Sequence, residues 1–158
     1  MAIYRKGVET QFGRFIIEGN EAGISKIVFP HQTRNLTDTA TICEAVEQAV
    51  KQIQNYFAGK PYYFSKLTYD FSEVTDFQRK ILQVLLSAPA KTLAYSELAE
   101  MSGYPNSSRA VGTVMNKNPF PILIPCHRVI QASGSMGNYA YGVAWKKRLL
   151  EHEKLAYC

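Results

Sequence analysis

The chain has 158 residues, a length typical of one globular domain or of two small ones. It contains 46% apolar and 20% charged residues, which excludes the disordered and fibrous classes. Lysine and arginine outnumber acidic residues by eighteen to thirteen, and a net charge of +5 suits a polyanionic partner without establishing one. No apolar run approaches the roughly 20 residues of a membrane span, so no membrane partner is expected.

Three cysteines, Cys43, Cys126 and Cys158, are spaced far apart and form no Cys-x-x-Cys pair. An odd number at these spacings predicts neither a disulfide framework nor a zinc knuckle. In the first half only Cys43 and His31 are candidate ligands, so no metal site is predicted. Residues 1–10 lack the apolar core of a secretory signal. We therefore expect a protein of the reducing cytoplasm.

The first half alternates between strand and helix patterns. Residues 2–29 are rich in β-branched and aromatic residues between glycine turns, which predicts β structure. Apolar residues then recur at spacings of three and four over 42–57, which predicts a helix that Gly59 and Pro61 end. Residues 60–74 are typical of a linker or an irregular strand. We expect an N-terminal α/β domain over residues 1–74.

The second half, residues 75–158, is predicted to be mainly helical. Thr75 and Gln78 have the spacing of a capping box at the start of a helix that Pro89 ends. Two short helices, Tyr95–Met101 and about Ser108–Asn116, follow, and a final helix is expected over Val143–Leu155. Two brief helices around a Gly/Pro turn outline a helix-turn-helix, although any helical corner gives this pattern.

The expected fold class is therefore mixed α/β (α+β). A small N-terminal domain of β-sheet and helix would pack on a mainly helical C-terminal domain with a winged-helix-like helix-turn-helix.

Cys126 ends an apolar run and is followed directly by His127 and Arg128. An isolated cysteine in such a run is usually a small core residue. A neighbouring imidazole and cation, however, are the usual means of producing a reactive thiolate. Because adjacent side chains in an extended segment point to opposite faces, a bridging water is the simpler route between Cys126 and His127.

Glu153 extends the inward-facing stripe of the C-terminal helix, with Lys146, Leu149 and Leu150. It could lie in solvent near the chain end, or be a partly buried carboxylate that needs a partner such as His127. Arg14 is expected to be a solvated surface charge. The same is expected of Lys146, Lys147 and Arg148 unless they face a phosphate.

Several motifs occur together in the order of a known family. They are Phe77-Gln78, Thr92-Leu-Ala-Tyr-Ser-Glu-Leu-Ala, Ser108-Arg-Ala-Val-Gly112, Asn118-Pro, Pro125-Cys-His-Arg-Val129, Gly137-Asn-Tyr139, and Lys146 followed by Leu149-Leu-Glu-His-Glu153. Over residues 75–155 the chain resembles the O6-alkylguanine-DNA alkyltransferase family, whose fold and activity the resemblance implies.

The implied function is DNA repair by direct reversal. One alkyl group would pass from O6 of guanine (more weakly O4 of thymine) to the chain's own cysteine, once per molecule and without a cofactor. The implied partner is double-stranded DNA that carries O6-alkylguanine, bound by a monomer with its target base flipped out.

The resemblance also implies a role for individual residues. Cys126 would accept the alkyl group, His127 would be the water-mediated base and Glu153 would orient it. Asn118 would steady the active-site turn, and Tyr95 would promote base rotation and donate to the leaving guanine. Arg109 would fill the space in the duplex, on a thin helix that exposes Ser108, Ala110 and Gly112 to the minor groove. The pocket would be lined by Pro121, Val129, Tyr139, Ala140 and Tyr141.

One departure affects the expected substrate range. The family usually has glycine where this chain has Tyr141, so large adducts such as benzyl are expected to fit less well than methyl. Two other functions stay open. One is a protein that flips alkylguanine without repairing it, which Cys126 argues against; the other is a thiol hydrolase built on Cys126 and His127.

Overall fold

The structure is a computed structural model, and residues 1–156 are described. It divides the chain into two compact units, Met1–Glu73 and the part that begins at Val74. Cys158 lies outside the described residues. No helix among those described is both long and apolar enough to cross a membrane.

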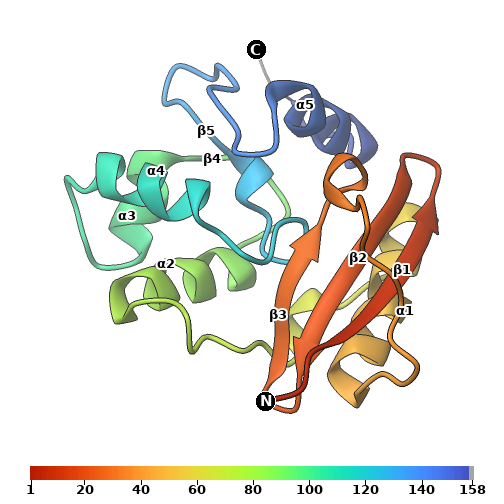
Figure 1. The fold of residues 1–158 in the computed structure, drawn as a ribbon. Helices are drawn as coiled ribbons and strands as arrows, with labels where there is room; N and C mark the ends of the chain where they lie inside the picture. The colour runs from red at the N-terminus through yellow and green to blue at the C-terminus, as the bar shows by residue number, and fades with distance from the viewer. Residues whose placement is uncertain (157–158) are drawn as a thin grey trace. The chain divides into compact units, whose positions relative to one another are not determined.

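The first unit is built on a three-stranded antiparallel sheet in the order β1-β2-β3 (Figure 1). Its strands are β1 (Tyr4–Thr10), β2 (Gly13–Asn20) and β3 (Gly23–Val28), which confirms β structure before residue 30. In β2 the consecutive residues Phe15, Ile16 and Ile17 are all fully buried, so both faces of the central strand are covered. A 3₁₀ turn, η1 (Pro30–Gln32), follows, and α1 (Glu44–Phe57) packs on the sheet.

Residues 60–74 close the β3 edge of this sheet. After the 3₁₀ helix η2 (Phe64–Lys66), Ile24 on β3 donates to Thr68 O at 2.9 Å and accepts from Asp70 N at 2.8 Å. The segment expected to be a linker or irregular strand is therefore hydrogen-bonded to the sheet, and it satisfies backbone groups that an edge strand would leave open.

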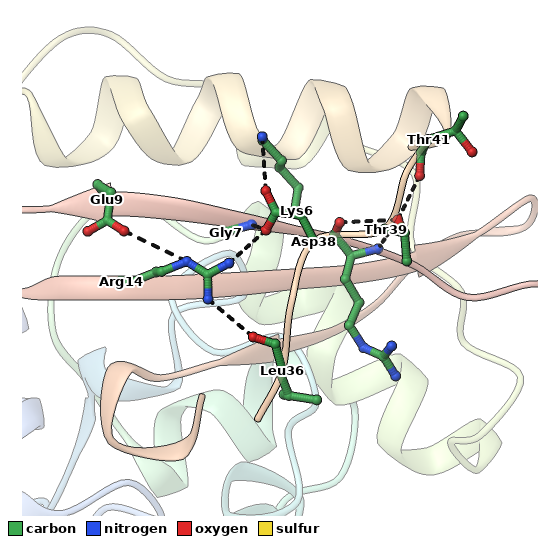
Figure 2. A network of polar contacts seen from close by, with 9 residues as sticks. Lys6, Gly7, Glu9, Arg14, Leu36, Asp38, Thr39 and Thr41 are labelled. Atoms are coloured by element: carbon green, nitrogen blue, oxygen red, sulfur yellow. Dashed lines mark hydrogen bonds and ion pairs between the residues drawn. The ribbon is translucent and has the colours of Figure 1, made fainter. Parts of the chain in front are cut away.

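The opposite edge, β1, is covered by the loop that follows η1. Thr39 N donates to Arg5 O at 3.0 Å, and Arg5 N donates to Thr39 Oγ1 at 3.0 Å (Figure 2). One residue further back, Asp38 receives the backbone N–H of Gly7 at 2.8 Å. The loop thus satisfies backbone groups of Arg5 and Gly7 that the edge strand would otherwise leave without partners.

Asp38 forms ion pairs with two basic side chains at this edge. Arg14 Nη2 lies 2.7 Å from one carboxylate oxygen and Lys6 Nζ lies 3.0 Å from the other (Figure 2). Arg14, expected to be a solvated charge, is instead an ion-pair partner that also reaches Leu36 O. The Gly7 amide, and after it Lys6, holds the pKa of Asp38 below its usual value.

The second unit is mainly helical, as expected. Its helices are α2 (Asp76–Ser87), α3 (Tyr95–Met101), α4 (Ser108–Asn116), the 3₁₀ helix η3 (Cys126–Arg128) and α5 (Val143–His152). The predicted capping box is present: Gln78 N donates to Thr75 Oγ1 at 3.2 Å, and Thr75 N donates to Gln78 Oε1 at 2.8 Å. The last helix is shorter than predicted, with Glu153 as its C-cap rather than an interior residue.

A short parallel strand pair, which the sequence patterns did not predict, organises this unit. β4 (Leu93–Ala94) pairs with β5 (Val129–Ile130), although 34 residues separate them. β4 leads directly into Tyr95 at the start of α3, and β5 begins directly after η3 with Cys126. The pairing therefore brings Tyr95 and Cys126 into one region of the unit.

The net positive charge belongs entirely to the second unit. Its sequence holds ten lysine and arginine residues against five acidic ones, whereas residues 1–73 hold eight of each. A basic unit that contains the helix-turn-helix provides the electrostatic basis for binding a polyanion.

The Asp38 cluster gives a prediction about the first unit. Asp38→Asn should lower its stability by about 1 kcal/mol at neutral pH, a modest value because the carboxylate is partly solvated. The pKa of Asp38 is lower in the folded state than in the unfolded state. Its contribution to folding stability is therefore present above the unfolded pKa of ~3.9 and is lost as pH falls through the folded pKa. Amide hydrogen exchange of the β1–β2 ladder should therefore differ between wild type and variant at neutral pH and converge in acid. Glu73→Gln, the matching change at an exposed position, is the control. An equal effect there would contradict the stabilising role of the Asp38 carboxylate.

Candidate active site

A tight turn after α4 carries the candidate nucleophile. Asn118 Nδ2 donates to Ile124 O at 2.9 Å, and Asn118 Oδ1 accepts from Phe120 N at 2.9 Å. Between these contacts Ile122 has φ +74°, a conformation that a β-branched residue rarely adopts. Asn118 thus lies buried across a strained turn, the position that its implied role as a brace requires.

Cys126 is almost completely buried, with 2% of its surface exposed. Its Sγ lies 3.7 Å from the hydroxyl of Tyr139. Burial raises the pKa of the Cys126 thiol, while hydrogen bonds with Asn118 and Tyr139 and the positive charge of Lys146 act against that rise. The thiol is therefore protonated at rest, and it is surrounded by groups that favour the thiolate.

His127 and Arg128 both bind the carboxylate of Glu153. His127 Nε2 is hydrogen-bonded to Oε2, and Arg128 Nε donates to Oε1 at 2.6 Å. Of the two interpretations of Glu153, the paired and buried one is correct, with 7% of its side chain exposed. Because an ionised carboxylate only accepts hydrogen bonds, Nε2 carries the proton of a neutral His127 ring and Nδ1 keeps a lone pair.

His127 Nδ1 is buried and has no hydrogen-bond partner within residues 1–156. It is therefore the free basic atom next to the thiol in sequence. The expected extended conformation is wrong here, because Cys126–Arg128 form a 3₁₀ helix in which consecutive side chains diverge by about 120°. No direct bond joins Sγ to His127 in this helix, so a bridging water remains the proposed route.

Lys146 was expected at the surface, and this expectation is wrong. It is fully buried, and its Nζ donates to Val129 O at 2.7 Å and to Asn138 O at 3.2 Å. Leu149 and Leu150 lie on the buried face of α5, and Lys146, one helical turn before them, lies on the same face. Its neighbours Lys147 and Arg148 are exposed.

A hollow of about 730 Å³ lies along the exposed side of α4. It is lined by Tyr95, Ser96, Ser108, Arg109, Gly112, Thr113, Asn116, Gln131 and Ala132. Arg109 is exposed at its border, and Gly112 offers only backbone, so another molecule can come close to the helix. Tyr95 lines this hollow, and burial raises the pKa of its hydroxyl, which a negative charge on Cys126 would raise further.

The remaining predicted residues fall in two groups. Pro121 and Val129 are buried, while Ala110 and Ala140 are exposed. The carbonyl of Val129, a residue expected to line the pocket, accepts a hydrogen bond from Lys146 Nζ, which leaves it one lone pair. Tyr141 donates its hydroxyl to Asn118 O at 3.2 Å and packs beside Tyr139, with ring centroids 5.5 Å apart. Its hydroxyl is thus bound to the active-site turn, and its effect on large adducts stays a prediction.

The described residues contain no cluster of three histidine, cysteine or acidic side chains able to hold a metal ion.

Two family models together cover nearly the whole chain. The DNA-binding domain of 6-O-methylguanine DNA methyltransferase matches residues 76–155, and the ribonuclease-like domain of the same protein matches residues 3–71. The chain belongs to the 6-O-methylguanine DNA methyltransferase family. The match confirms the resemblance expected from the motifs around Cys126 and extends it to the first half.

Individual relatives in this family cover similar lengths. The methylated-DNA–protein-cysteine methyltransferase of Mycobacterium leprae is 36% identical over 155 residues, covering 96% of this chain and 93% of the relative. The human protein of that name is 31% identical, covering 94% of this chain and 79% of its own. A solved structure of Mycobacterium tuberculosis OGT in complex with DNA shares the fold, with a TM-score of 0.80, 34% identity and coverage of 95% and 92%.

Sequence reasoning missed the burial of Lys146 in this methyltransferase site and the contact between Arg128 and Glu153. For Lys146 the signal was present, because its spacing from Leu149 and Leu150 places it on their face. For Arg128 no sequence signal indicated that it shares Glu153 with His127.

The buried carboxylate gives a stability prediction. Glu153→Gln should destabilise the second unit by about 3 kcal/mol, because it leaves Arg128 buried without its counter-charge. Urea unfolding followed by the fluorescence of Trp145 on α5 measures this loss. Glu100→Gln, at an exposed position on α3, should change stability by less than about 0.5 kcal/mol. Equal effects at the two positions would contradict a structural ion pair at Glu153.

Proposed function

We propose that the protein is a methylated-DNA–protein-cysteine methyltransferase that repairs O6-alkylguanine by direct reversal. The observation that carries this proposal is that Cys126 and His127 directly follow the strained turn held by Asn118, and that His127 is bound to Glu153 at the end of α5. Relatives that bear this enzyme's name match the chain over 94–96% of its length.

Thiol activation would proceed through His127. Glu153 holds Nε2–H, so Nδ1 can accept the thiol proton of Cys126 through a bridging water. The thiolate then attacks the alkyl carbon: an S–C bond forms, the C–O6 bond breaks, and guanine leaves with a proton returned to it. The thioether product has no readily hydrolysed bond, so each molecule would act once and without a cofactor.

Binding of the lesion would use the exposed side of α4. The base must leave the stack to reach Cys126, at a cost of a few kcal/mol. Arg109 would fill the vacated space, while the small surface around Ala110 and Gly112 lets α4 approach the minor groove. Tyr95, at the inner border of the hollow, would donate its hydroxyl proton to the leaving guanine.

We infer that the protein acts in the cytoplasm, because a reactive free thiol is stable in a reducing compartment.

Intact mass spectrometry tests the reaction. Mixed with excess duplex carrying O6-methylguanine, the protein should gain one methyl group per chain, and peptide mapping should place it on Cys126. Cys126→Ser should gain none. Binding without mass gain would support a lesion-recognition protein instead, and repeated turnover of a small ester would support a hydrolase.

A second prediction separates base flipping from chemistry. Arg109→Ala should slow methyl transfer from the duplex by about tenfold or more, since a contact that supports an extruded base is worth at least ~1.4 kcal/mol. Transfer from free O6-methylguanine should be nearly unchanged. Lys117→Ala removes a positive charge at an exposed position just beyond α4, and it is the control for the loss of charge alone. Equal losses on duplex and free base would contradict the proposed role of Arg109.

A further inference from the structure

Residues 137–142, called the cover segment below, lie against the sulfur of Cys126. Tyr139 places its hydroxyl 3.7 Å from Sγ, while its neighbours Asn138 and Ala140 are exposed. The cover segment therefore separates the sulfur from solvent on this side, and Cys126 keeps only 2% of its surface exposed. Because an incoming carbon atom must reach Sγ itself, the thiol can react only after part of its surroundings has moved.

Tyr141 fastens the cover segment to the active-site turn. Its hydroxyl donates to the backbone carbonyl of Asn118 at 3.2 Å, and its ring centroid lies 5.5 Å from that of Tyr139. Burial raises the pKa of Tyr141, so the hydroxyl stays protonated and able to donate at neutral pH. Asn118 is itself held in place, since its side chain bonds the backbone of Ile124 and Phe120. The bond therefore joins a loop to a fixed point.

Glycines with positive φ stand at both ends of the cover segment. Gly137 has φ +69° and Gly142 has φ +102°. At Gly142 a β-carbon would meet no atom within 4 Å, so the backbone conformation and not close packing requires the glycine. A turn closed by Gly142 N, which donates to Tyr139 O at 3.0 Å, keeps the two tyrosines of the segment together. This construction allows the segment to move as one body about its ends.

The hydrogen bond of Tyr141 is of a strength suited to control such a movement. A neutral hydrogen bond changes an equilibrium by about three- to tenfold, because water replaces the lost partner when the bond breaks. The bond can therefore change how often the cover segment opens while the rest of the unit stays folded.

We propose that Tyr141 is a latch: its hydrogen bond to Asn118 holds the cover segment closed over Cys126 and limits how often an electrophile reaches the sulfur. The inference rests on the proposed function only in identifying that electrophile as the alkyl carbon of a flipped guanine. Tyr141 acts through the segment and not on the reacting atoms, so it is a positioning residue.

Alkylation of the free protein by iodoacetamide measures access to the sulfur, and peptide mapping reports Cys126 separately from the other cysteines. Tyr141→Phe keeps the ring and removes the hydroxyl, so it should raise the rate at Cys126 about three- to tenfold. The midpoint of the pH dependence of this rate should not change, because the latch controls access and not ionisation. An unchanged or slower rate, or a shifted midpoint without a faster plateau, would overturn the proposal.

Thr75→Ala separates opening of the cover segment from unfolding of the whole unit. It removes the side-chain cap of α2, a loss of stability similar to that of one hydrogen bond, and it lies outside the segment. The rate at Cys126 should stay at the wild-type value in this variant. An equal rise in Thr75→Ala and Tyr141→Phe would overturn the proposal, because unfolding would then expose the sulfur.

A measurement on the wild-type protein keeps the test decisive if Tyr141→Phe does not fold. Opening of a short segment exposes little surface, so the rate at Cys126 should stay nearly constant in urea below the unfolding transition. A rate that rises steeply with urea would overturn the proposal. None of these measurements uses DNA, so failure here is distinct from failure of the proposed function, which shows as wild-type protein that accepts no methyl group.

Discussion

The carboxylate of Glu153, bound by both His127 and Arg128, is the interaction on which the site depends. It joins the C-terminal end of α5 to the 3₁₀ helix that carries Cys126. Because an ion pair removed from water is stable only when both charges stay paired, the three residues act as one structural element. The same contact fixes the tautomer of His127 and leaves Nδ1 as the basic atom. One hydrogen-bond arrangement therefore sets both the fold around the proposed nucleophile and its chemistry.

Burial of Cys126 has opposite effects on the reactivity of its sulfur before and during the reaction. A desolvated thiol stays protonated, which protects it from unspecific electrophiles. In the same low-dielectric surroundings the donors Asn118 and Tyr139, and the ammonium of Lys146, act more strongly on any charge that develops on sulfur. The basic helix-turn-helix beside it supplies the affinity for a polyanion, which is stronger at low salt. Reactivity would thus arise only when a bound lesion brings an alkyl carbon to the sulfur.

The local patterns of the sequence were sufficient for most helices. The capping box at Thr75 and the apolar spacing of α1 are short-range signals, and the structure has both. The pairing of β4 with β5 was not predictable in this way, since two-residue strands carry no periodicity and their pairing is long-range. Lys146 was misjudged because a lysine within Lys-Lys-Arg is usually exposed, whereas its position on α5 favoured the interior. The Arg128–Glu153 contact depends on tertiary packing that no sequence spacing shows.

In the proposed reaction, an alkyl carbon passes from guanine to the sulfur of Cys126. Duplex DNA with an isotope-labelled methyl group on O6 tests it most directly, because NMR distinguishes O-methyl from S-methyl carbon. We predict that the label leaves the DNA and appears as a thioether on Cys126, at one label per chain. A label that stays on guanine, is released to solvent or settles on another residue would contradict the account.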